Sequence, residues 1–144
     1  MGGHEVTFLL DTNVWLFGAN DPEALPEDIQ ELLDERDAQF GLSAISLWEV
    51  GKKNQVGKLE LRQELSVWLK GAIASHIQML PISPEVVADA MGLPDFPMRD
   101  PADELIVATA RVHKLTLLTT DTKFKGYRHA KIHYFKPIVE KGRK

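Results

Sequence analysis

The sequence predicts an α/β fold in which an open, mostly parallel sheet is covered by helices on both faces. Short apolar runs rich in strand-forming residues alternate with longer segments whose apolar residues recur every three or four positions. No hairpin signal joins neighbouring strand-like runs, so each strand is expected to lead into a helix before the next strand. With 144 residues and 44% apolar composition, the chain fits one globular domain, residues 1–144.

The predicted strands are short apolar runs that stop at polar or turn-forming residues. The first run is Val-Thr-Phe-Leu-Leu at residues 6–10, and it stops abruptly at Asp11. A continuous apolar run of this length is typical of a parallel strand that is buried on both faces. Four further runs have the same character, at residues 40–42, 77–80, 116–118 and 132–135.

Helical periodicity accounts for most of the remaining chain. Three of the predicted helices have a clear start, because Ser43, Ser83 and Asp100 can each cap a helix, and Pro follows the last two. Asp103 lies three residues after Asp100, where it can complete a capping box. The predicted helices cover a segment from residue 14 onward and residues 27–38, 44–55, 61–75, 84–91 and 101–112.

The composition limits where the protein works and what it contains. The sequence has no cysteine, which excludes disulfides and thiolate metal sites and fits a reducing, cytoplasmic location. No apolar run approaches the roughly 18 residues of a membrane span, so no membrane association is expected. The first residues lack the basic region and long apolar stretch of a secretory signal.

The net charge of −4 hides an asymmetry along the chain. Residues 1–110 contain 7 Lys or Arg against 19 Asp or Glu, whereas residues 111–144 contain 10 against 2. An acidic body beside a basic C-terminal third suits a cation-binding centre next to a surface that contacts a polyanion. A solvated basic surface without a ligand explains the same numbers equally well.

Four acidic residues are expected at one edge of the sheet. Asp11 ends the first strand, Asp121 follows the fourth, Asp103 opens the helix before that strand, and Glu49 lies in an apolar helix after the second. Ligands of open parallel sheets bind outside the carboxyl ends of the strands. Each acid alone has a structural explanation: a helix cap, an Asx turn, or a pair with Lys53 one turn away. Together they predict a single cluster.

Such a cluster has a restricted chemistry. Two carboxylates about 5 Å apart repel each other by roughly 3 kcal/mol at an effective dielectric constant near 20. Either some carboxyl pKa values rise or a cation neutralises the group. Oxygen ligands favour Mg²⁺ or Mn²⁺ over zinc, and Mg²⁺ is commonly completed by water and substrate phosphates. The cluster therefore points to metal-assisted phosphodiester chemistry.

The motifs that contain these acids resemble those of the PIN-domain family, most closely the VapC-type toxins of bacterial toxin–antitoxin pairs. The resemblance covers roughly residues 6–135, and the motifs occur in the order of the family. They are Leu-Leu-Asp11-Thr-Asn13, Ser46-Leu-Trp-Glu49-Val, Asp100-Pro-Ala-Asp103 and Leu-Leu-Thr-Thr-Asp121. The resemblance implies a three-layer α/β/α sandwich and an endoribonuclease that depends on Mg²⁺ or Mn²⁺. It also implies a cognate antitoxin and a homodimer as partners.

The resemblance assigns roles to individual residues. Four acids would bind one or two metal ions and position the attacking water: Asp11, Glu49, Asp103 and Asp121. Three polar residues match positions that orient the carboxylates or the water: Asn13, Ser46 and Thr119. Asp100 belongs to the same motif, although capping alone explains it. Glu104 stands where this form of the motif usually has Arg, which removes one candidate phosphate contact.

An RNA substrate would need cations around the acidic cluster. The candidates lie on the helix of Glu49 and after the fourth strand: Lys52, Lys53, Lys123, Lys125, Arg128 and Lys131. Binding through such contacts is independent of sequence and sensitive to salt. Any one of them can equally be a solvated surface side chain.

Other functions remain as alternatives. A PIN fold that binds RNA or protein without cutting would keep the motifs but lack turnover. A Mg²⁺-dependent receiver domain needs paired acids after the first strand and an acceptor Asp after the third, but Asp11 is unpaired and Pro81 follows the third strand. A dehalogenase-type phosphatase needs a second Asp where Asn13 stands. His129 and His133 have metal-binding spacing only on a helix, whereas a strand is predicted there.

Overall fold

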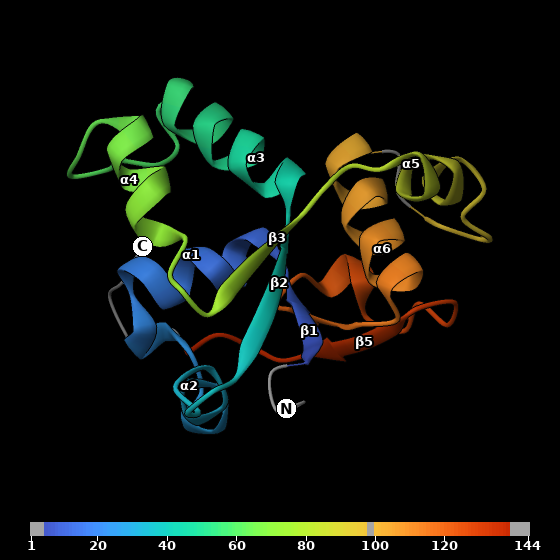
Figure 1. Ribbon diagram of the computed structural model, residues 1–144, viewed down its shortest axis with the longest axis horizontal. Coiled ribbons are helices and arrows are strands. Elements are labelled where there is room, and N and C mark those ends of the chain that lie inside the picture. Colours follow the sequence, from blue (N-terminus) through green and yellow to red (C-terminus); the bar gives the residue numbers. More distant parts are fainter. Residues whose placement is uncertain (1–4, 98–99, 139–144) are drawn as a thin grey trace.

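A computed structural model describes residues 5–97 and 100–138 of the protein (Figure 1). Its centre is one five-stranded sheet with the strand order β3-β2-β1-β4-β5. All four strand pairings in this sheet are parallel, which confirms the predicted parallel arrangement. The strands are β1 (Val6–Leu10), β2 (Gln39–Ser43), β3 (Ile77–Leu80), β4 (Thr116–Thr119) and β5 (Lys131–Tyr134).

Helices cover both faces of the sheet, so the expected α/β/α layering is confirmed. Leu10 packs on one face with α1, α2, α3 and α4, whereas its neighbour Leu9 packs on the other face with α6. This alternation follows from the two-residue side-chain period of a strand. The helices are α1 (Thr12–Asn20), α2 (Glu27–Leu33), α3 (Ala44–Gln55), α4 (Leu65–Ala72), α5 (Pro84–Met91) and α6 (Pro101–His113), with short 3₁₀ turns η1 (Pro22–Ala24) and η2 (Thr122–Phe124).

Two predicted helices are shorter in the structure than expected. The helix expected over residues 27–38 ends at Leu33, and the one expected over residues 61–75 runs only from Leu65 to Ala72. The residues lost from the first are mainly charged, and three of the four lost from the start of the second are polar. A helix in a globular protein is stabilised mainly by packing of an apolar face. These polar segments offer few apolar side chains for such packing, so they do not extend the helices.

The predicted caps of three helices are present. The Ser43 hydroxyl accepts a hydrogen bond from the Ile45 N–H (3.2 Å), and the Ser83 hydroxyl accepts one from the Val86 N–H (3.2 Å). Asp100 caps α6, which then runs for 13 residues from the carboxyl edge of the sheet towards its amino edge. Within the part of the chain that the structure describes, no helix has the length and apolar character needed to cross a membrane.

Candidate active site

Asp11 is held at the carboxyl end of β1 in a buried position, with only 5% of its surface exposed. One carboxylate oxygen accepts a hydrogen bond from the Thr12 N–H at 2.8 Å, which makes Asp11 the cap of α1. The other accepts a hydrogen bond from the Thr119 hydroxyl at 2.6 Å. Thr119 is the last residue of β4, so adjacent strand ends share this contact.

Thr12 links Asp11 to the helix that carries Glu49. Its hydroxyl lies 2.8 Å from the Ser46 hydroxyl and donates a short hydrogen bond to a carboxylate oxygen of Glu49. The sequence prediction included Ser46 and Glu49 but missed Thr12. The one indication in the sequence was that Thr12 directly follows Asp11, at the point where the first strand ends and the next helix begins.

The ion pair with Lys53 that would explain Glu49 on structural grounds alone is not among the contacts of the described residues. Instead, the Lys53 ammonium group donates to the side-chain carbonyl of Asn13 at 3.0 Å. Asn13 is exposed, and this contact joins the first turn of α1 to α3. Asn13 therefore lies at the rim of the site, where it contacts a lysine rather than a carboxylate.

Asp103 lies in the first turn of α6 and is 8% exposed. The Asp100 carboxylate caps this turn by accepting hydrogen bonds from the Ala102 N–H (2.8 Å) and the Asp103 N–H (3.3 Å). Among the described residues, no hydrogen bond returns from the Asp103 carboxylate to complete the expected capping box. The Lys123 ammonium group lies 3.9 Å from one oxygen of this carboxylate. Capping explains Asp100 but does not explain Asp103.

Asp121 forms an Asx turn, which is the structural explanation for an acid at this position. Its carboxylate accepts a hydrogen bond from the Lys123 N–H at 2.9 Å and caps η2. Its own N–H donates to the Thr119 hydroxyl at 3.0 Å. The Thr119 hydroxyl therefore joins Asp121 to Asp11, because it accepts from one residue and donates to the other.

The electrostatics of the site show that the acidic residues act on one another. Burial raises the pKa of Asp11 to about 6, hydrogen bonds from Thr119 and Thr12 oppose the rise, and the charges of Glu49 and Asp121 add to it. A group that interacts with two other acids across three different elements lies in a shared negative field.

Asp103 belongs to the same field. Burial raises the pKa of Asp103 to about 7, and the nearby charge of Asp100 adds to the rise. Lys123 opposes it, while Asp11 and Glu49 raise it further. The four predicted acids are thus electrostatically coupled at the carboxyl edge of the sheet.

The donor chemistry of this cluster fits a hard divalent cation, because every donor is a carboxylate or hydroxyl oxygen. Among the described residues, the four acids have one ion pair, between Asp103 and Lys123, so most of their negative charge is not neutralised. The side chains are not arranged as a closed coordination shell, however. Within the described residues, no group of three or more His, Cys, Asp or Glu is placed to hold one ion. Asp11 and Glu49 instead direct oxygens at the hydroxyls of Thr119 and Thr12.

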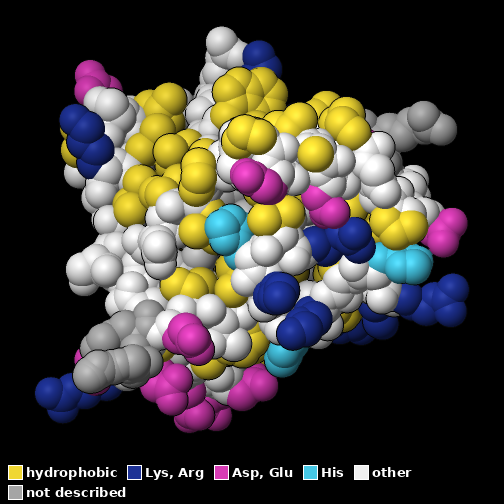
Figure 2. Space-filling model, turned by 45° about the vertical axis from the view of Figure 1, so that its right-hand side comes forward, with side chains coloured by type: hydrophobic (Ala, Val, Ile, Leu, Met, Phe, Trp, Pro, Cys, Tyr) yellow, Lys and Arg dark blue, Asp and Glu magenta, His cyan; other side chains and the backbone are white. Residues whose placement is uncertain are grey.

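The predicted RNA-binding cations have different surroundings in the structure. Lys123 faces Asp103, whereas Lys52 donates to Gln55 at 2.7 Å on its own helix. The Lys125 ammonium group lies 5.0 Å from the centre of the Tyr134 ring. Arg128 and Lys131 are exposed. Figure 2 shows Lys and Arg side chains gathered on the side of the molecule that carries α6 and β5.

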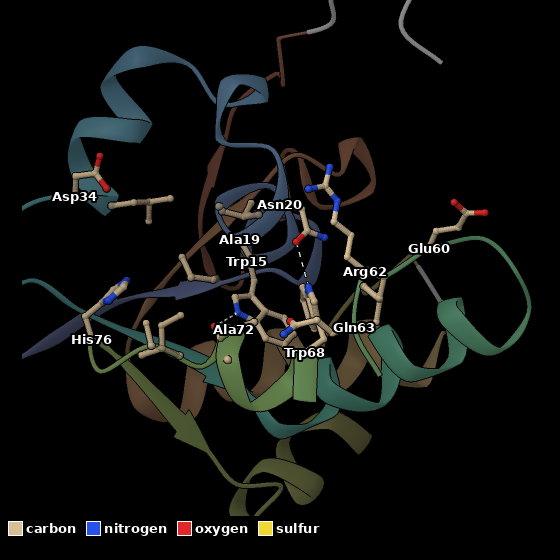
Figure 3. Close-up of a pocket in the computed structure, with 18 residues that line it drawn as sticks. Trp15, Ala19, Asn20, Asp34, Glu60, Arg62, Gln63, Trp68, Ala72 and His76 are labelled. Carbon is tan, nitrogen blue, oxygen red and sulfur yellow. Dashed lines mark hydrogen bonds between the residues drawn. The ribbon is translucent and has the colours of Figure 1, made fainter. Parts of the chain in front are cut away.

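A cavity of about 780 Å³ lies elsewhere, between α1, the segment 60–63 and α4 (Figure 3). None of the four acids lines it. Two buried tryptophans meet beside it at 5.4 Å between ring centres, Trp15 and Trp68. The Trp15 indole N–H donates to the Ala72 carbonyl at 2.9 Å, and that of Trp68 donates to the Asn20 side chain at 3.2 Å. Trp68 is therefore a core residue, whereas Trp48 is 59% exposed.

These features agree with comparisons with known proteins. The PIN domain family model matches residues 8–130, and the chain belongs to the PIN-domain family. Within that family it resembles Ribonuclease VapC22 of Mycobacterium tuberculosis (strain ATCC 25618 / H37Rv), with 32% identity over 123 residues. That match covers 85% of this chain and 93% of the relative.

Solved structures with low sequence identity share the fold. A DNA-bound VapBC complex from Salmonella typhimurium matches with a TM-score of 0.69 and 20% identity. VapBC2 from Rickettsia felis, bound to a DNA fragment from its promoter, matches with a TM-score of 0.67 and 19% identity. Each match covers 90% of this chain and 98% of the solved chain. These likenesses support the PIN-like architecture.

Proposed function

We propose that the protein is a metal-dependent endoribonuclease and the toxin of a toxin–antitoxin pair. The main observation is the coupled acidic cluster at the carboxyl edge of a PIN-domain sheet, where Asp11 and Asp103 have raised pKa values. The relative named as a ribonuclease supports RNA as the substrate. The likeness to VapBC complexes supports a cognate antitoxin as a partner. A homodimer, expected from the resemblance, belongs to the same proposal.

The residues of the site would have distinct roles in cleavage. Mg²⁺ or Mn²⁺, held by carboxylates drawn from Asp11, Glu49, Asp103 and Asp121, would supply an activated water and neutralise charge at the scissile phosphate. Thr119 fixes the orientation of the Asp11 carboxylate through its hydroxyl. Thr12 fixes the orientation of Glu49 in the same way, and Ser46 in turn contacts the Thr12 hydroxyl. Such supporting hydrogen bonds commonly hold metal ligands in position.

Lys123 has a separate role in this proposal. Its ammonium group lies at the rim of the cluster, 3.9 Å from Asp103, and its exposed side chain is free to meet a phosphate. A cation at this position would attract the RNA backbone to a site that is otherwise negative. Glu104 offers no such attraction, so Lys123 takes the place of the phosphate contact that the motif lacks.

One observation favours the alternative of a PIN fold that binds RNA without cutting it. The described acids do not form a closed metal-binding group. Against this alternative, Asp103 is buried without a hydrogen bond to its carboxylate among the described residues, and its ion pair with Lys123 is long, at 3.9 Å. Burial of a carboxylate with so little compensation costs stability. A cation would offset that cost, whereas RNA binding alone would increase it.

A cleavage assay separates the two. The purified protein is incubated with a panel of structured RNAs in Mg²⁺, in Mn²⁺ and in EDTA. We expect cleavage only with a metal ion and its loss in Asp11→Asn, while Asp28→Asn on the exposed surface of α2 retains it. Cleavage in EDTA, or normal cleavage by Asp11→Asn, would contradict the proposal.

A further inference from the structure

The segment between β4 and β5 carries a row of cations from one edge of the sheet to the other. It leaves the carboxyl edge after Asp121, and it re-enters the sheet at Lys131, which pairs with Thr116 at the amino edge. Because both strands are parallel, this segment must run alongside the sheet in the direction opposite to the strands. Four cations follow one another along it: Lys123, Lys125, Arg128 and Lys131.

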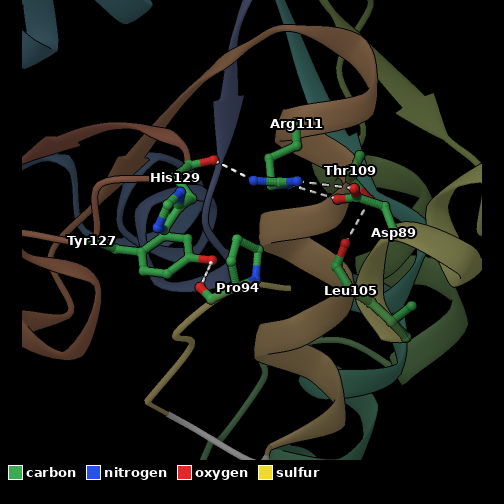
Figure 4. A network of polar contacts seen from close by, with 7 residues as sticks. All are labelled: Asp89, Pro94, Leu105, Thr109, Arg111, Tyr127 and His129. Atoms are coloured by element: carbon green, nitrogen blue, oxygen red, sulfur yellow. Dashed lines mark hydrogen bonds and ion pairs between the residues drawn. The ribbon is translucent and has the colours of Figure 1, made fainter. Parts of the chain in front are cut away.

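The segment is fixed to α6 along its length. Phe124 and Tyr127 pack in the same apolar cluster as Ile106 and Val107 of α6. At the far end of α6, the Arg111 guanidinium donates to the His129 carbonyl at 2.5 Å (Figure 4). The row of cations therefore follows α6 from the acidic site to the opposite edge of the sheet.

Arg111 fixes the segment to α6, and its own positive charge is paired with an acid. Its guanidinium forms two hydrogen bonds with Asp89 of α5, at 2.8 and 3.2 Å, as Figure 4 shows. A bidentate pair of this kind fixes geometry as well as charge. Arg111 thereby ties α5, α6 and the cationic segment together at the amino edge of the sheet.

Two cavities line the cationic row and share residues. The first, of about 190 Å³, includes Lys123, Lys125, Arg128 and His129, with Asp95 as its acidic residue. The second, of about 550 Å³, lies at the C-terminal end of α6 and includes Lys114, Arg128, His129 and Lys131. Arg128 and His129 line both, so the two cavities adjoin at these residues.

The charge of the second cavity favours an anion. Its single acid, Asp89, is neutralised by Arg111, which leaves Lys114, Arg128 and Lys131. Among the described residues, none of these three forms a salt bridge. The C-terminal end of α6 contributes only about half a negative charge, so the cations exceed it.

Lys114 occupies a backbone position that is unfavourable for lysine. It caps α6 in the left-handed conformation, with φ of 59° and ψ of 43°, where glycine or asparagine is usual. Helix capping is served better by those residues, although the lysine charge is favourable beside the negative end of α6. The Lys114 ammonium group also adds to the anion-binding surface of the second cavity.

We infer that the RNA substrate extends from the acidic cluster along this cationic row, and that the second cavity binds its backbone phosphates. The inference rests on the proposed function for the identity of the strand. The 13 residues of α6 span about 20 Å, which corresponds to about six stacked nucleotides. An RNA with fewer than about six nucleotides between the acidic cluster and its end on the α6 side does not reach Lys114 and Lys131.

The test measures binding of fluorescent oligouridylates of about 4, 8 and 16 nucleotides at several salt concentrations. The full chain is used in the Asp11→Asn background, and wild-type protein in EDTA is measured in parallel. The test pair is Lys114→Asn with Lys131→Gln, because asparagine tolerates the left-handed backbone. The control pair removes two exposed lysines near α4, Lys58→Gln with Lys70→Gln. Thermal melting confirms that each variant is folded.

We expect the test pair to weaken binding by a factor that grows with RNA length, to about tenfold for the longest RNA at low salt. The slope of log Kd against log salt should fall by about 1.4, because two phosphate contacts of a single strand are lost. The control pair should leave affinity and slope as in the parent. Unchanged affinity and slope in the test pair, or an equal loss in the control pair, would overturn the inference.

Two further outcomes identify the ligand and separate the proposals. A polyglutamate peptide of matched charge that binds as tightly as the longest RNA would overturn the assignment of this surface to RNA. If wild-type protein cuts RNA but the test pair has no effect on binding, only the present inference fails. If the length-dependent loss is observed but no RNA is cut, the RNA-binding surface stands and the nuclease proposal fails.

Discussion

Asp11 and Asp103 lie at the same edge of the sheet, but the fold holds their carboxylates by different means. Asp11 receives hydrogen bonds from Thr12 and Thr119, which stabilise its charged form. Among the described residues, the Asp103 carboxylate has an ion pair with the Lys123 ammonium group at 3.9 Å and no hydrogen bond. The pKa of Asp11 accordingly rises to about 6, and that of Asp103 rises to about 7.

The difference indicates what each position is built to do. Hydrogen bonds fix the orientation of Asp11, as is expected for a ligand that stays in place whether or not an ion is bound. Asp103 has no such bonds among the described residues, and Lys123 at 3.9 Å compensates its charge only in part, so a bound cation would add most of the compensation. The two residues should therefore respond alike in activity and differently in stability.

The largest expected effect is on activity. Asp103→Asn should reduce RNA cleavage by about a thousandfold or more, because it removes both the charge and a ligand from the reacting centre. Single-turnover cleavage rates in Mn²⁺ measure this directly. Glu104→Gln, a change at the next residue of the same helix turn, is the matched control. Equal losses in both variants would show that α6 tolerates no change there, rather than that Asp103 is a ligand.

A smaller loss is expected when the support of Asp11 is removed. Thr119→Val deletes the hydroxyl that joins Asp11 and Asp121 but keeps the shape of the side chain. Loss of such a supporting contact typically costs about 10- to 100-fold in metal affinity or activity. Thr109→Val is the control, because that buried hydroxyl only donates to the Leu105 carbonyl of its own helix. A metal titration of the cleavage rate compares the two variants.

The smallest effect concerns stability and its dependence on pH. The folded pKa of Asp103, about 7, lies above its ordinary value of 3.8, so the metal-free folded state binds more protons between these limits. Stability should therefore fall as pH rises from about 4 to about 7, and Asp103→Asn should remove this part of the fall.

Chemical denaturation of the metal-free protein at pH 4 and pH 8 measures that change. The advantage of Asp103→Asn over wild type should be near zero at pH 4 and about 1–2 kcal/mol at pH 8. This is less than the full pKa shift would give, because solvent screens part of the interaction. If Asp103→Asn is instead less stable than wild type at pH 8, the charged Asp103 carboxylate must be stabilised by more than its contact with Lys123.

The sequence predicted the parallel sheet, its helical covering and the caps because these depend on local patterns. The apolar run at 6–10 and the Pro residues after Ser83 and Asp100 each signal an element without reference to the rest of the chain. Helix ends at Leu33 and Leu65 were misplaced because they depend on which side chains find an apolar surface to pack against.

The candidate site likewise has parts that the sequence predicts and parts that depend on the folded structure. The predicted parallel sheet placed Asp11 and Asp121 at one edge. The structure adds that β1 and β4 are neighbours, which brings their carboxyl ends together. The bridge through Thr12 could not be predicted, because it depends on the distance between the first turn of α1 and α3 in the folded protein. The contact between Lys53 and Asn13 could not be predicted for the same reason, since Asn13 reaches Lys53 across the two helices.

The account depends on the four acids acting together as one cation site, and ion binding tests this most directly. Titration of Mn²⁺ into the protein, followed by calorimetry and by the rise in melting temperature, should give binding that is lost in Asp11→Asn and in Asp103→Asn. At an ion concentration of about 100 times Kd, the wild type should gain about 2.7 kcal/mol of stability. Equal Mn²⁺ binding in wild type and both variants, or none in wild type, would contradict the account.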